Sequence, residues 1–430
     1  MSESTRHAIG VWIESPEGAQ WANQGMTRLL GFLVEGIALS GEHVFRITVT
    51  DEIRDQAEED FADLNATAGI DYTFHSPRDA GVTADHFDEL ADFANRHVNV
   101  KCWLSLFPNQ LSSRLLNSPV CTIFPDAIGL AYHDFSDAAW AMQGPPVQWR
   151  ERVRRTLAAS SGVITFSSHV AHSQVMAMFG EDETRIRVIP HAPPSLDGIL
   201  PFSKDGIRNA ETRFRAAQIL RDHAARKGLS YLFDFPFEHV RFAAISTQDR
   251  VTKNIRIAVD AVDCIVRERQ DSFKVITTAQ LHHGTHFTPT PRAIEVAQLH
   301  FDVLSMPDLP REVHAALYHC AELAVHTSVF EGGRGVFPYY ESISVGTPCL
   351  RADGLHVAEL LEHAPELAEF VFDPHDGAGL AALILACSAD RERVTSVQKA
   401  TYDHLARRTW GDVAREYAEA ALAGTARAPS

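Results

Sequence analysis

Two glutamates, Glu331 and Glu341, flank a glycine-rich segment, GGRGVFPYY, that could bind an anionic ligand. The apolar run 323–325 predicts a short buried strand, and Pro338 favours the first turn of a helix that is predicted to end at Gly346. A strand, a glycine loop and a helix N-terminus in succession present free backbone N–H groups and the positive end of a helix dipole. A solvated glutamate pair at a helix entry is the simpler alternative.

A pair of cations, Arg250 and Lys253, follows the predicted strand 242–247 and precedes the predicted helix 255–268. Cations at the start of a helix oppose its dipole, which indicates a phosphate partner. By itself this feature favours a solvated surface turn, so the phosphate interpretation depends on the rest of the chain.

Histidines could also carry chemistry in two segments. His133 follows the apolar run 128–132, which predicts a strand, so it would stand at a strand end, where α/β domains bind ligands. The loop with His282, His283 and His286 has neither a nearby cysteine nor a helical i,i+4 pair, so a plain loop is favoured over a metal site. The sequence contains no G-x-S-x-G motif and no P-loop.

Predicted strands and helices alternate along both halves of the chain, which is the pattern of parallel α/β sheets. The first helix opens at Gly25. Strands are predicted at 7–14, 43–50, 71–75, 98–106, 128–132, 163–166 and 186–189, and then at 242–247, 274–278, 302–305, 323–325 and near Phe370. We therefore predict an α/β fold with two doubly wound, Rossmann-like domains facing a cleft.

The predicted domain limits follow from breaks in this alternation and from the usual size of a domain. Residues 1–200 form an N-terminal domain, and 201–237 form a linker with an inserted helix at 209–226. Residues 238–407 form a second α/β domain, and 408–430 form a final helix.

Net charge, cysteine positions and apolar runs limit the classes of function that the chain can have. The 430 residues carry a net charge of −17, which disfavours a nucleic-acid backbone as a partner. The six cysteines are scattered without a C-x-x-C pair and are interpreted as reduced core residues of a cytosolic protein. We expect no signal peptide, because the N-terminal MSESTRHAIG has no basic region followed by an apolar one. We expect no spanning segment, because the longest apolar run, LLGFLVEGIAL, is short and is interrupted by Glu35. Peripheral membrane association stays open.

Several segments together resemble glycosyltransferase family 4, a group of retaining, nucleotide-sugar-dependent enzymes with the GT-B fold. The chain is similar to the family in IGLAYHDFS, in SGVITFSSHVAHSQVMAMFGEDETRIRVIPHAP, in FEGGRGVFPYYESISVGTPCL and in the terminal RRTWGDVAREYAEAAL. The resemblance covers nearly the whole chain except about 195–237. It implies that the Rossmann-like domain 1–200 lies on the acceptor side and that the domain 238–407 binds the nucleotide sugar. It also implies that the last helix, 408–430, crosses back to the first domain.

The resemblance also implies roles for residues at matching positions. Glu331 would hold hydroxyls of the donor sugar, Glu341 would bind the ribose, and Lys253 with Arg250 would neutralise the departing diphosphate. His133 would lie beside the transferred sugar. The remaining donor-binding residues implied are Gly25, Met26, Thr27, Ser246, Thr247, Gly332, Gly333, Arg334, Gly335 and Val336. No metal and no cofactor is expected, since cations and helix dipoles take that part.

The chain departs from the family pattern at three places. The glutamates enclose nine residues where the family has seven, so the loop is two residues longer. Arg250 lies three residues before Lys253, whereas the family's arginine lies further upstream. His191 stands where the family has an asparagine after the proline.

The resemblance therefore predicts a retaining glycosyltransferase that moves a hexose-type sugar from a nucleoside diphosphate-sugar, such as GDP-mannose or a UDP-sugar, to a hydroxyl acceptor. The family's commonest setting is cell-surface polysaccharide or glycolipid assembly, with a glycan or lipid-linked acceptor. We expect a cytoplasmic protein, with peripheral association at the inner face of the membrane as an option. The alternatives are a catalytically inactive GT-B protein that binds a nucleotide sugar or a partner, and a GT-B epimerase or hydrolase.

Overall fold

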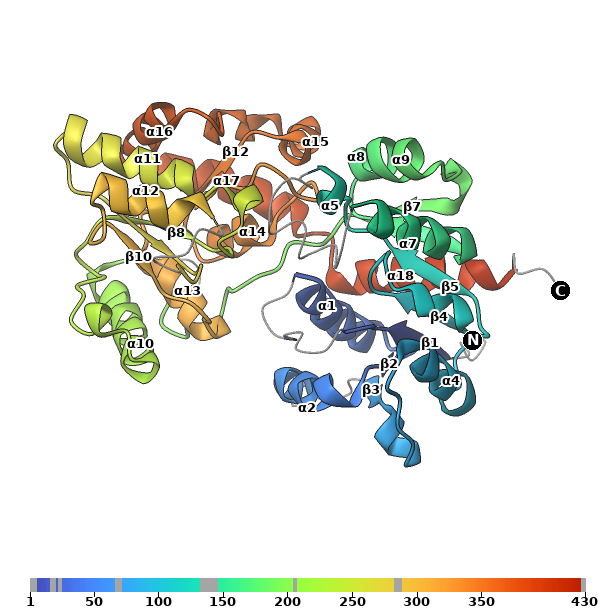
Figure 1. Ribbon diagram of the computed structural model, residues 1–430. Coiled ribbons are helices and arrows are strands. Elements are labelled where there is room, and N and C mark those ends of the chain that lie inside the picture. The colour runs from blue at the N-terminus through green and yellow to red at the C-terminus, as the bar shows by residue number, and fades with distance from the viewer. Residues whose placement is uncertain are drawn as a thin grey trace. The chain divides into compact units, whose positions relative to one another are not determined.

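The computed structural model describes residues 6–15, 21, 25–65, 72–131, 146–203, 207–281 and 288–426. Residue contacts divide these into two compact units (Figure 1). Unit 1 comprises the described residues up to 192 together with 408–426, and unit 2 comprises the described residues of 193–407. The limits predicted at 200, 237 and 407 stay predictions.

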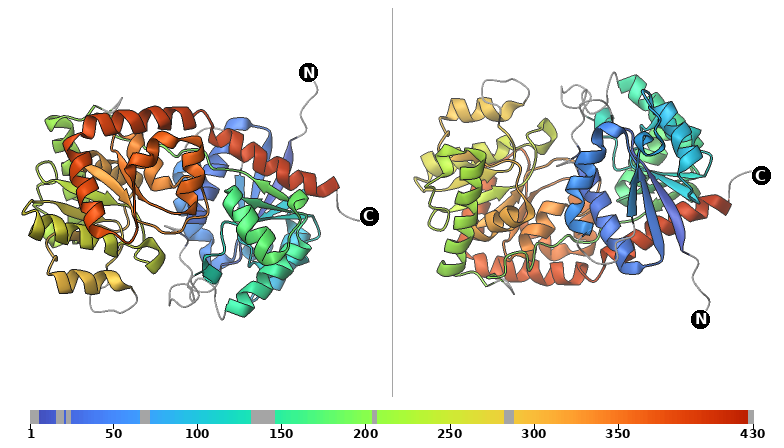
Figure 2. Two further views of the ribbon diagram at one scale, coloured as in Figure 1. Left: turned by 90° about the horizontal axis from the view of Figure 1, so that it is seen from above. Right: turned by 90° about the horizontal axis from the view of Figure 1, so that it is seen from below.

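Unit 1 is built on a parallel seven-stranded sheet with the order β3-β2-β1-β4-β5-β6-β7. The strands are β1 (His7–Trp12), β2 (His43–Thr48), β3 (Tyr72–His75), β4 (Cys102–Ser105), β5 (Val120–Ile123), β6 (Gly162–Thr165) and β7 (Ile186–Val188). The central strands are apolar along their length because helices cover both faces of the sheet, as Figure 2 shows for this unit. The chain order reverses between β1 and β4, so the switch point of this sheet lies there.

The helices of unit 1 pack on the two faces of that sheet. They are α1 (Gly25–Ser40), α2 (Asp51–Asp60), α3 (Ala62–Asn65), α4 (Phe87–His97), α5 (Ile128–Ala131), α7 (Pro146–Ala159), α8 (Ser168–Val170), α9 (Ala177–Phe179) and α18 (Trp410–Ala423). One face of β1 places Ile9 and Val11 in the core shared with α1 and α18, and the other places Trp12 against Trp103 and the α4 side.

The last helix, α18, belongs to unit 1 and packs along α1 (Figure 1). Gly36 allows this close approach, because a Cβ at that position would lie 2.2 Å from the carbonyl oxygen of Trp410. The rings of Phe32 and Trp410 stack with centroids 4.6 Å apart, and the His191 ring lies 5.7 Å from Trp410. The predicted return of the final helix to the first domain is confirmed.

Unit 2 has a parallel six-stranded sheet with the order β10-β9-β8-β11-β12-β13. The strands are β8 (Phe242–Ile245), β9 (Lys274–Thr277), β10 (Val303–Ser305), β11 (Leu323–His326), β12 (Cys349–Ala352) and β13 (Val371–Phe372). The helices are α10 (Ala210–Lys227), α11 (Arg256–Asp263), α12 (Pro289–Ala297), α13 (Arg311–Cys320), α14 (Phe337–Ser344), α15 (Leu355–His363), α16 (Gly377–Ala389) and α17 (Arg391–Leu405). The switch point of this sheet lies between β8 and β11.

Helix α10 comes from the segment predicted to link the domains, yet its apolar face lies in the core of unit 2. Ala216, Leu220 and Ala224 are fully buried there, and α10 packs against α13. Asn209 caps the helix, and Gly228 ends it in the left-handed conformation at φ 70°. The inserted helix therefore contributes to a domain core.

The structure differs from the sequence prediction at residues 128–131. This apolar run was predicted to be a strand but forms the short helix α5. The Asp126 carboxylate accepts a hydrogen bond from the Ile128 N–H at 2.9 Å, which favours a helical start after the Pro125 turn. The neighbouring strand is β5, which the prediction missed, as it missed β12. His133 and Asp134, like the His282 to His286 loop, lie outside the described residues.

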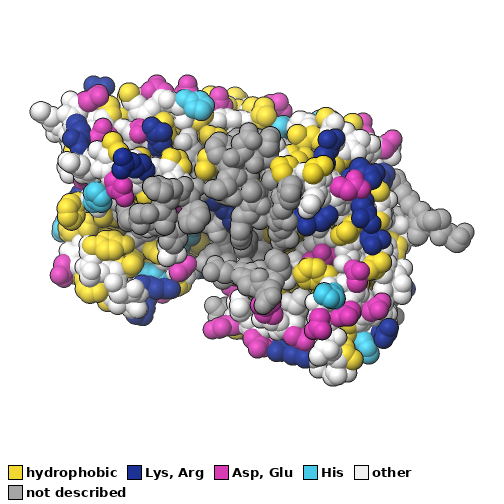
Figure 3. Space-filling view, viewed as in Figure 1, with side chains coloured by type: hydrophobic (Ala, Val, Ile, Leu, Met, Phe, Trp, Pro, Cys, Tyr) yellow, Lys and Arg dark blue, Asp and Glu magenta, His cyan; other side chains and the backbone are white. Residues whose placement is uncertain are grey.

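All six cysteines are buried and free of disulfides, as their scattered positions predicted. Among the described residues, no helix combines the length and apolar character needed to cross a bilayer. On the face drawn in Figure 3, acidic and basic side chains are interspersed over both units.

Candidate active site

The candidate site of unit 2 lies at the carboxyl ends of β8 and β11, the two strands that flank the switch point. In parallel α/β sheets this edge is where ligands bind, because the chains leaving adjacent strands diverge there. The segment after β8 carries Lys253, and the segment after β11 carries Glu331. Adjacent strands thus bring together two residues that are 78 positions apart in the sequence.

Two hydrogen bonds to backbone carbonyls hold the Lys253 turn against the end of β11. Residues Val251–Lys253 form one 3-10 turn with Arg250 at its N-cap, and Asn254 ends it in the left-handed region at φ 47°. The Thr327 hydroxyl donates to the Lys253 carbonyl at 2.5 Å, and the Val329 N–H donates to the Thr252 carbonyl at 3.1 Å. The position of Lys253 is therefore fixed by main-chain geometry rather than by its own flexible side chain.

Lys253, Glu331 and His326 form the polar centre of the site. The Lys253 Nζ lies 2.6 Å from Glu331 Oε1, and His326 Nε2 lies 3.2 Å from the same oxygen. Burial alone would raise the pKa of the Glu331 carboxyl, but the Lys253 charge and the contacts from His326 outweigh it and hold that pKa well below its usual range. Glu331 is therefore an anion at neutral pH and can accept hydrogen bonds from sugar hydroxyls.

A second histidine, His356 near the start of α15, packs against His326. Its ring lies 6.3 Å from the His326 ring in an edge-on arrangement. Burial lowers the pKa of His356 to about 3, while the Glu331 charge raises it, so the ring is neutral at pH 7. Gly354 lies over this ring, because a Cβ there would stand 3.0 Å from it. Sequence reasoning assigned a role to neither histidine, although His326 ends a strand directly before the glycine loop.

The glycine loop between Glu331 and α14 is shaped by Tyr340. A Cβ at Gly335 would lie 1.8 Å from the Tyr340 hydroxyl oxygen, so this residue must be glycine for the loop to pass over the ring. Val336 is the N-cap of α14, and Pro338 lies in its first turn as predicted. Gly332 is buried and Arg334 is half-buried, with Gly333 between them.

We expect Gly335→Ala to destabilise unit 2 by roughly 1–3 kcal/mol, because the new methyl group overlaps the buried Tyr340 ring. Adding Tyr340→Leu should recover much of this loss by vacating the space. Gly31→Ala in α1 is the matched control, since its Cβ would meet only the Phe61 ring at an ordinary 3.9 Å. Urea denaturation followed by circular dichroism measures all three. A loss that Tyr340→Leu does not reduce would contradict the overlap.

Glu341 lies at the middle of α14 and is only 2% exposed, so the solvated alternative considered for it is wrong. Its Oε2 is 4.0 Å from His314 Nδ1 on α13. The carboxylate is thus held inside the unit on the helix that follows the glycine loop. Its assignment to a ribose stays a prediction.

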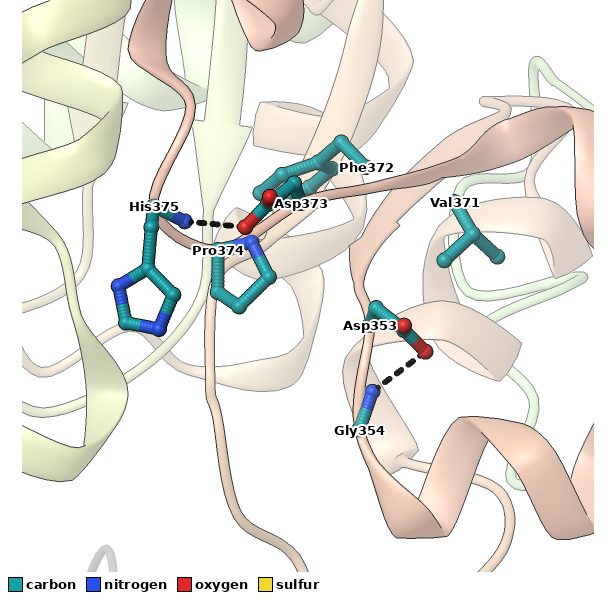
Figure 4. Close-up of a pocket in the computed structure, with 7 residues that line it drawn as sticks. All are labelled: Asp353, Gly354, Val371, Phe372, Asp373, Pro374 and His375. Atoms are coloured by element: carbon teal, nitrogen blue, oxygen red, sulfur yellow. Dashed lines mark hydrogen bonds between the residues drawn. The ribbon is translucent and has the colours of Figure 1, made fainter.

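A shallow pocket of about 420 Å³ adjoins this centre at the carboxyl ends of β12 and β13. Figure 4 shows the two loops that line it, one with Asp353 and Gly354 and the other running from Asp373 to His375. Each loop is closed by its own aspartate, which accepts from the backbone N–H of Gly354 or of His375 at 2.8 Å. The Asn254 side chain, next to Lys253, donates to the Pro374 carbonyl at 2.9 Å. This hydrogen bond joins the pocket lining to the segment that carries Lys253.

The other residues predicted to bind the donor lie in both units. Ser246 and Thr247 directly follow β8, and the Thr247 N–H donates to the Thr278 hydroxyl at 2.9 Å. Arg250 is half-buried at its N-cap position. In unit 1, Gly25 opens α1 and is followed by Met26 and by the buried Thr27. Within the described residues, no group of three or more His, Cys, Asp or Glu side chains is arranged to hold a metal ion.

The switch point of unit 1 holds a carboxylate that sequence reasoning missed, Glu14. It follows β1, and its Oε1 accepts from the Trp12 indole at 3.0 Å and from the Ser112 N–H at 2.8 Å. Burial raises the pKa of Glu14 to about 7, although these hydrogen bonds act to lower it, and the nearby Asp88 charge raises it further. An acid that titrates near neutral pH at this edge could bind or exchange a proton.

The raised pKa of Glu14 gives a stability prediction with a defined sign. Because the folded pKa of about 7 exceeds the ordinary glutamate pKa of 4.5, the folded state binds this proton more tightly. The contribution is full below pH 4.5 and is lost as the pH rises through 7, by about 3 kcal/mol. Glu14→Gln should remove this loss between pH 5 and pH 8, and Glu59→Gln, at an exposed position, should not. Identical pH profiles for wild type and Glu14→Gln would contradict it.

Comparison with known proteins gives structural matches alone. No protein-family model and no curated protein matches the chain. Sucrose-phosphate synthase from Thermosynechococcus elongatus is 14% identical, with 98% of this chain and 100% of that one covered at a TM-score of 0.66. Anabaena Alr3699/HepE in complex with UDP-glucose is 15% identical, with 96% and 99% covered and a TM-score of 0.63. A glycosyltransferase from Rickettsia africae is 13% identical, with 99% and 100% covered and a TM-score of 0.60.

At these identities the likeness establishes the fold and nothing finer. Both parallel α/β domains are matched over nearly the full length of this chain and of the others, so the predicted GT-B fold is confirmed. The donor, the acceptor and the roles of individual residues are not part of what a fold establishes.

Proposed function

We propose that this protein is a glycosyltransferase that transfers a hexose-type sugar from a nucleoside diphosphate-sugar to a hydroxyl acceptor. The observation that carries the proposal is the Lys253–Glu331 pair, which stands beside a glycine loop at the switch point of unit 2. Support comes from the fold, which is shared with Anabaena HepE in complex with UDP-glucose. A UDP-sugar or GDP-mannose is the proposed donor.

The proposed chemistry divides the roles by charge. Glu331, an anion in the folded protein, accepts hydrogen bonds from hydroxyls of the donor sugar. Lys253 and Arg250 stabilise the negative charge that grows on the diphosphate as its bond to the anomeric carbon breaks. Backbone N–H groups of the glycine loop and the positive end of α14 act on the same anion. Glu341 binds the ribose, and Ser246 with Thr247 line the donor side.

We propose retention of the anomeric configuration. The acceptor oxygen attacks on the face from which the diphosphate leaves, and the departing phosphate oxygen takes the acceptor proton. This route needs no carboxylate nucleophile, and the cations and helix dipole replace a metal. The proposed setting is polysaccharide or glycolipid assembly, with a glycan or lipid-linked acceptor and peripheral association at the cytoplasmic face of the membrane.

One observation favours a second candidate, a GT-B protein that binds a nucleotide sugar without turnover. Lys253 is already paired with Glu331 at 2.6 Å, and the loop between the glutamates is two residues longer than in the family it resembles. If this ion pair persists when the donor is bound, Lys253 cannot stabilise the negative charge that develops on the leaving group. An epimerase or hydrolase differs from both in that it converts the donor without an acceptor.

One experiment separates these functions. The purified protein is screened by thermal shift against UDP-, GDP-, ADP- and dTDP-sugars, since a ligand at about 100 times its Kd adds about 2.7 kcal/mol of stability. Binding donors are then incubated with and without hydroxyl acceptors, release of nucleoside diphosphate is measured, and the product anomer is assigned by NMR. Acceptor-dependent release with retention supports the proposal. Binding without release supports the inactive binder, and acceptor-independent conversion supports the epimerase or hydrolase.

A further inference from the structure

Arg351 on β12 is a buried cation to which no described residue supplies a counter-charge. It is 1% exposed, and none of its three guanidinium nitrogens has a hydrogen-bond partner among the described residues. Among the described residues no carboxylate lies within ion-pair distance of it. Its guanidinium group lies over the Tyr339 ring, whose centroid is 4.3 Å from the guanidinium carbon. A charge removed from water without a partner destabilises a fold, so its presence calls for another explanation than stability.

This cation stands one strand away from the Glu331 centre. In the sheet register Arg351 pairs with His326, and strands in a sheet are about 4.8 Å apart. His326 is the residue that contacts Glu331 at 3.2 Å. Two further polar atoms, Tyr339 Oη and His356 Nε2, are buried without a hydrogen-bond partner among the described residues. The region between β12, α14 and α15 is thus rich in donors and has positive charge.

The charges at the centre itself nearly cancel. Lys253 and Glu331 neutralise each other, and burial keeps the pKa of His356 at about 3, so that ring is uncharged at neutral pH. A diphosphate carries several negative charges and requires net positive charge nearby. Arg334 and Arg250 are half-exposed, and water and salt screen them; the field of Arg351 passes through protein, where it is screened much less.

We infer that Arg351 is a positioning residue whose uncompensated charge is kept in the interior to favour a diphosphate at the Lys253–Glu331 centre. This inference rests on the proposed function, because it assumes that the ligand of the centre is a nucleoside diphosphate group. It predicts that the charge of Arg351 has opposite effects on stability and on ligand binding. Removing the charge should make the protein at least as stable, and it should weaken binding of the diphosphate.

The test uses the full-length protein with Arg351→Met, which keeps an unbranched apolar stem, and Arg351→Lys, which keeps the charge. Binding of UDP, GDP and ADP, and of the parent nucleosides, is measured by calorimetry, and stability by thermal unfolding. Arg393→Met is the matched control, since it removes an exposed positive charge from unit 2. We expect Arg351→Met to unfold no earlier than wild type and to bind the diphosphate about tenfold more weakly. Nucleoside binding should be unchanged.

The variants separate charge from structure. Arg351→Lys should keep diphosphate affinity within about threefold of wild type, because the charge remains in place. Three results for Arg351→Met would each overturn the inference. They are unfolding at a lower temperature than wild type, unchanged affinity for the diphosphate, and an equal loss of affinity for the nucleoside and the diphosphate. If wild type binds none of the three diphosphates, the proposed function fails and the inference with it. If wild type binds and Arg351→Met binds equally, only the inference fails.

Discussion

Replacing Lys253 by methionine is expected to lower turnover of a sugar-nucleotide donor by about two to three orders of magnitude. The proposed role of its ammonium group is to follow negative charge onto the leaving diphosphate, which is strongest in the transition state. Lys253 also holds Glu331 at 2.6 Å, so its removal disturbs a second residue of the centre. The effect should therefore appear in kcat as well as in KM, measured by release of nucleoside diphosphate.

A double-mutant cycle with Glu331→Gln tests whether the two residues act as a unit. Each single substitution should cost nearly as much as both together, because residues that act together are strongly non-additive. Lys253→Met should also raise the pKa of Glu331. Burial acts to raise this pKa, and the charge of Lys253, which acts to lower it, would be gone. Its residual activity should then fall at a higher pH than that of wild type.

The control for Lys253→Met is Lys399→Met on α17, which removes a partly exposed lysine of the same unit. Lys399 pairs with Asp403 and lies over the Tyr402 ring. Turnover within twofold of wild type is expected for this variant. Full activity in Lys253→Met, or additive effects in the cycle, would remove Lys253 and Glu331 from the chemistry.

The fold was largely predictable because glycine and proline mark its turns clearly. In unit 2 the sequence placed β11, the glycine loop and α14 correctly, since Pro338 and Gly346 bound the helix and the apolar run precedes it. Strand β12 was missed because Arg351 interrupts its four residues, and a charge inside a short apolar run hides a buried strand. Strand β5 was missed for a related reason: four residues after a proline give no measurable period.

The site was predictable only in part, because its geometry depends on strand order. Lys253 and Glu331 were both proposed, yet their contact follows from the adjacency of β8 and β11, which no local pattern encodes. His326 and His356 escaped notice because a single histidine among apolar residues is usually structural. Glu14 was not identified from the sequence either, because its raised pKa comes from burial against a turn that is 98 residues away in the chain.

Acidification from pH 7 to pH 4 is expected to unfold unit 2 before unit 1. In unit 2 burial lowers the pKa of His319 to about 4 and that of His356 to about 3, below the ordinary histidine pKa of 6.5. For a depressed histidine pKa, the stabilisation is present above 6.5 and is lost as the pH falls, by about 3 kcal/mol for His319 alone. Glu331, with its lowered pKa, adds a loss of the same sign at lower pH.

These losses are large beside the stability of an ordinary domain, which is about 5–15 kcal/mol. In unit 1 the comparable loss from His191, whose pKa burial lowers to about 3, is offset by Glu14, whose contribution grows as the pH falls from 7 to 4.5. The described tryptophans all lie in unit 1, so tryptophan fluorescence reports that unit, and far-ultraviolet circular dichroism reports both. Loss of ellipticity should precede the change in fluorescence.

His319→Gln isolates one contribution to this acid transition. Glutamine can keep the hydrogen bond that His319 Nε2 makes with the Thr212 hydroxyl at 2.9 Å, but it cannot take up a proton in this range. The first transition should therefore move to lower pH and become less steep by about one proton. His375→Gln, at an exposed position, should leave the curve where it is. A first transition seen in fluorescence, or equal curves for wild type and His319→Gln, would show that buried histidines of unit 2 do not set its acid stability.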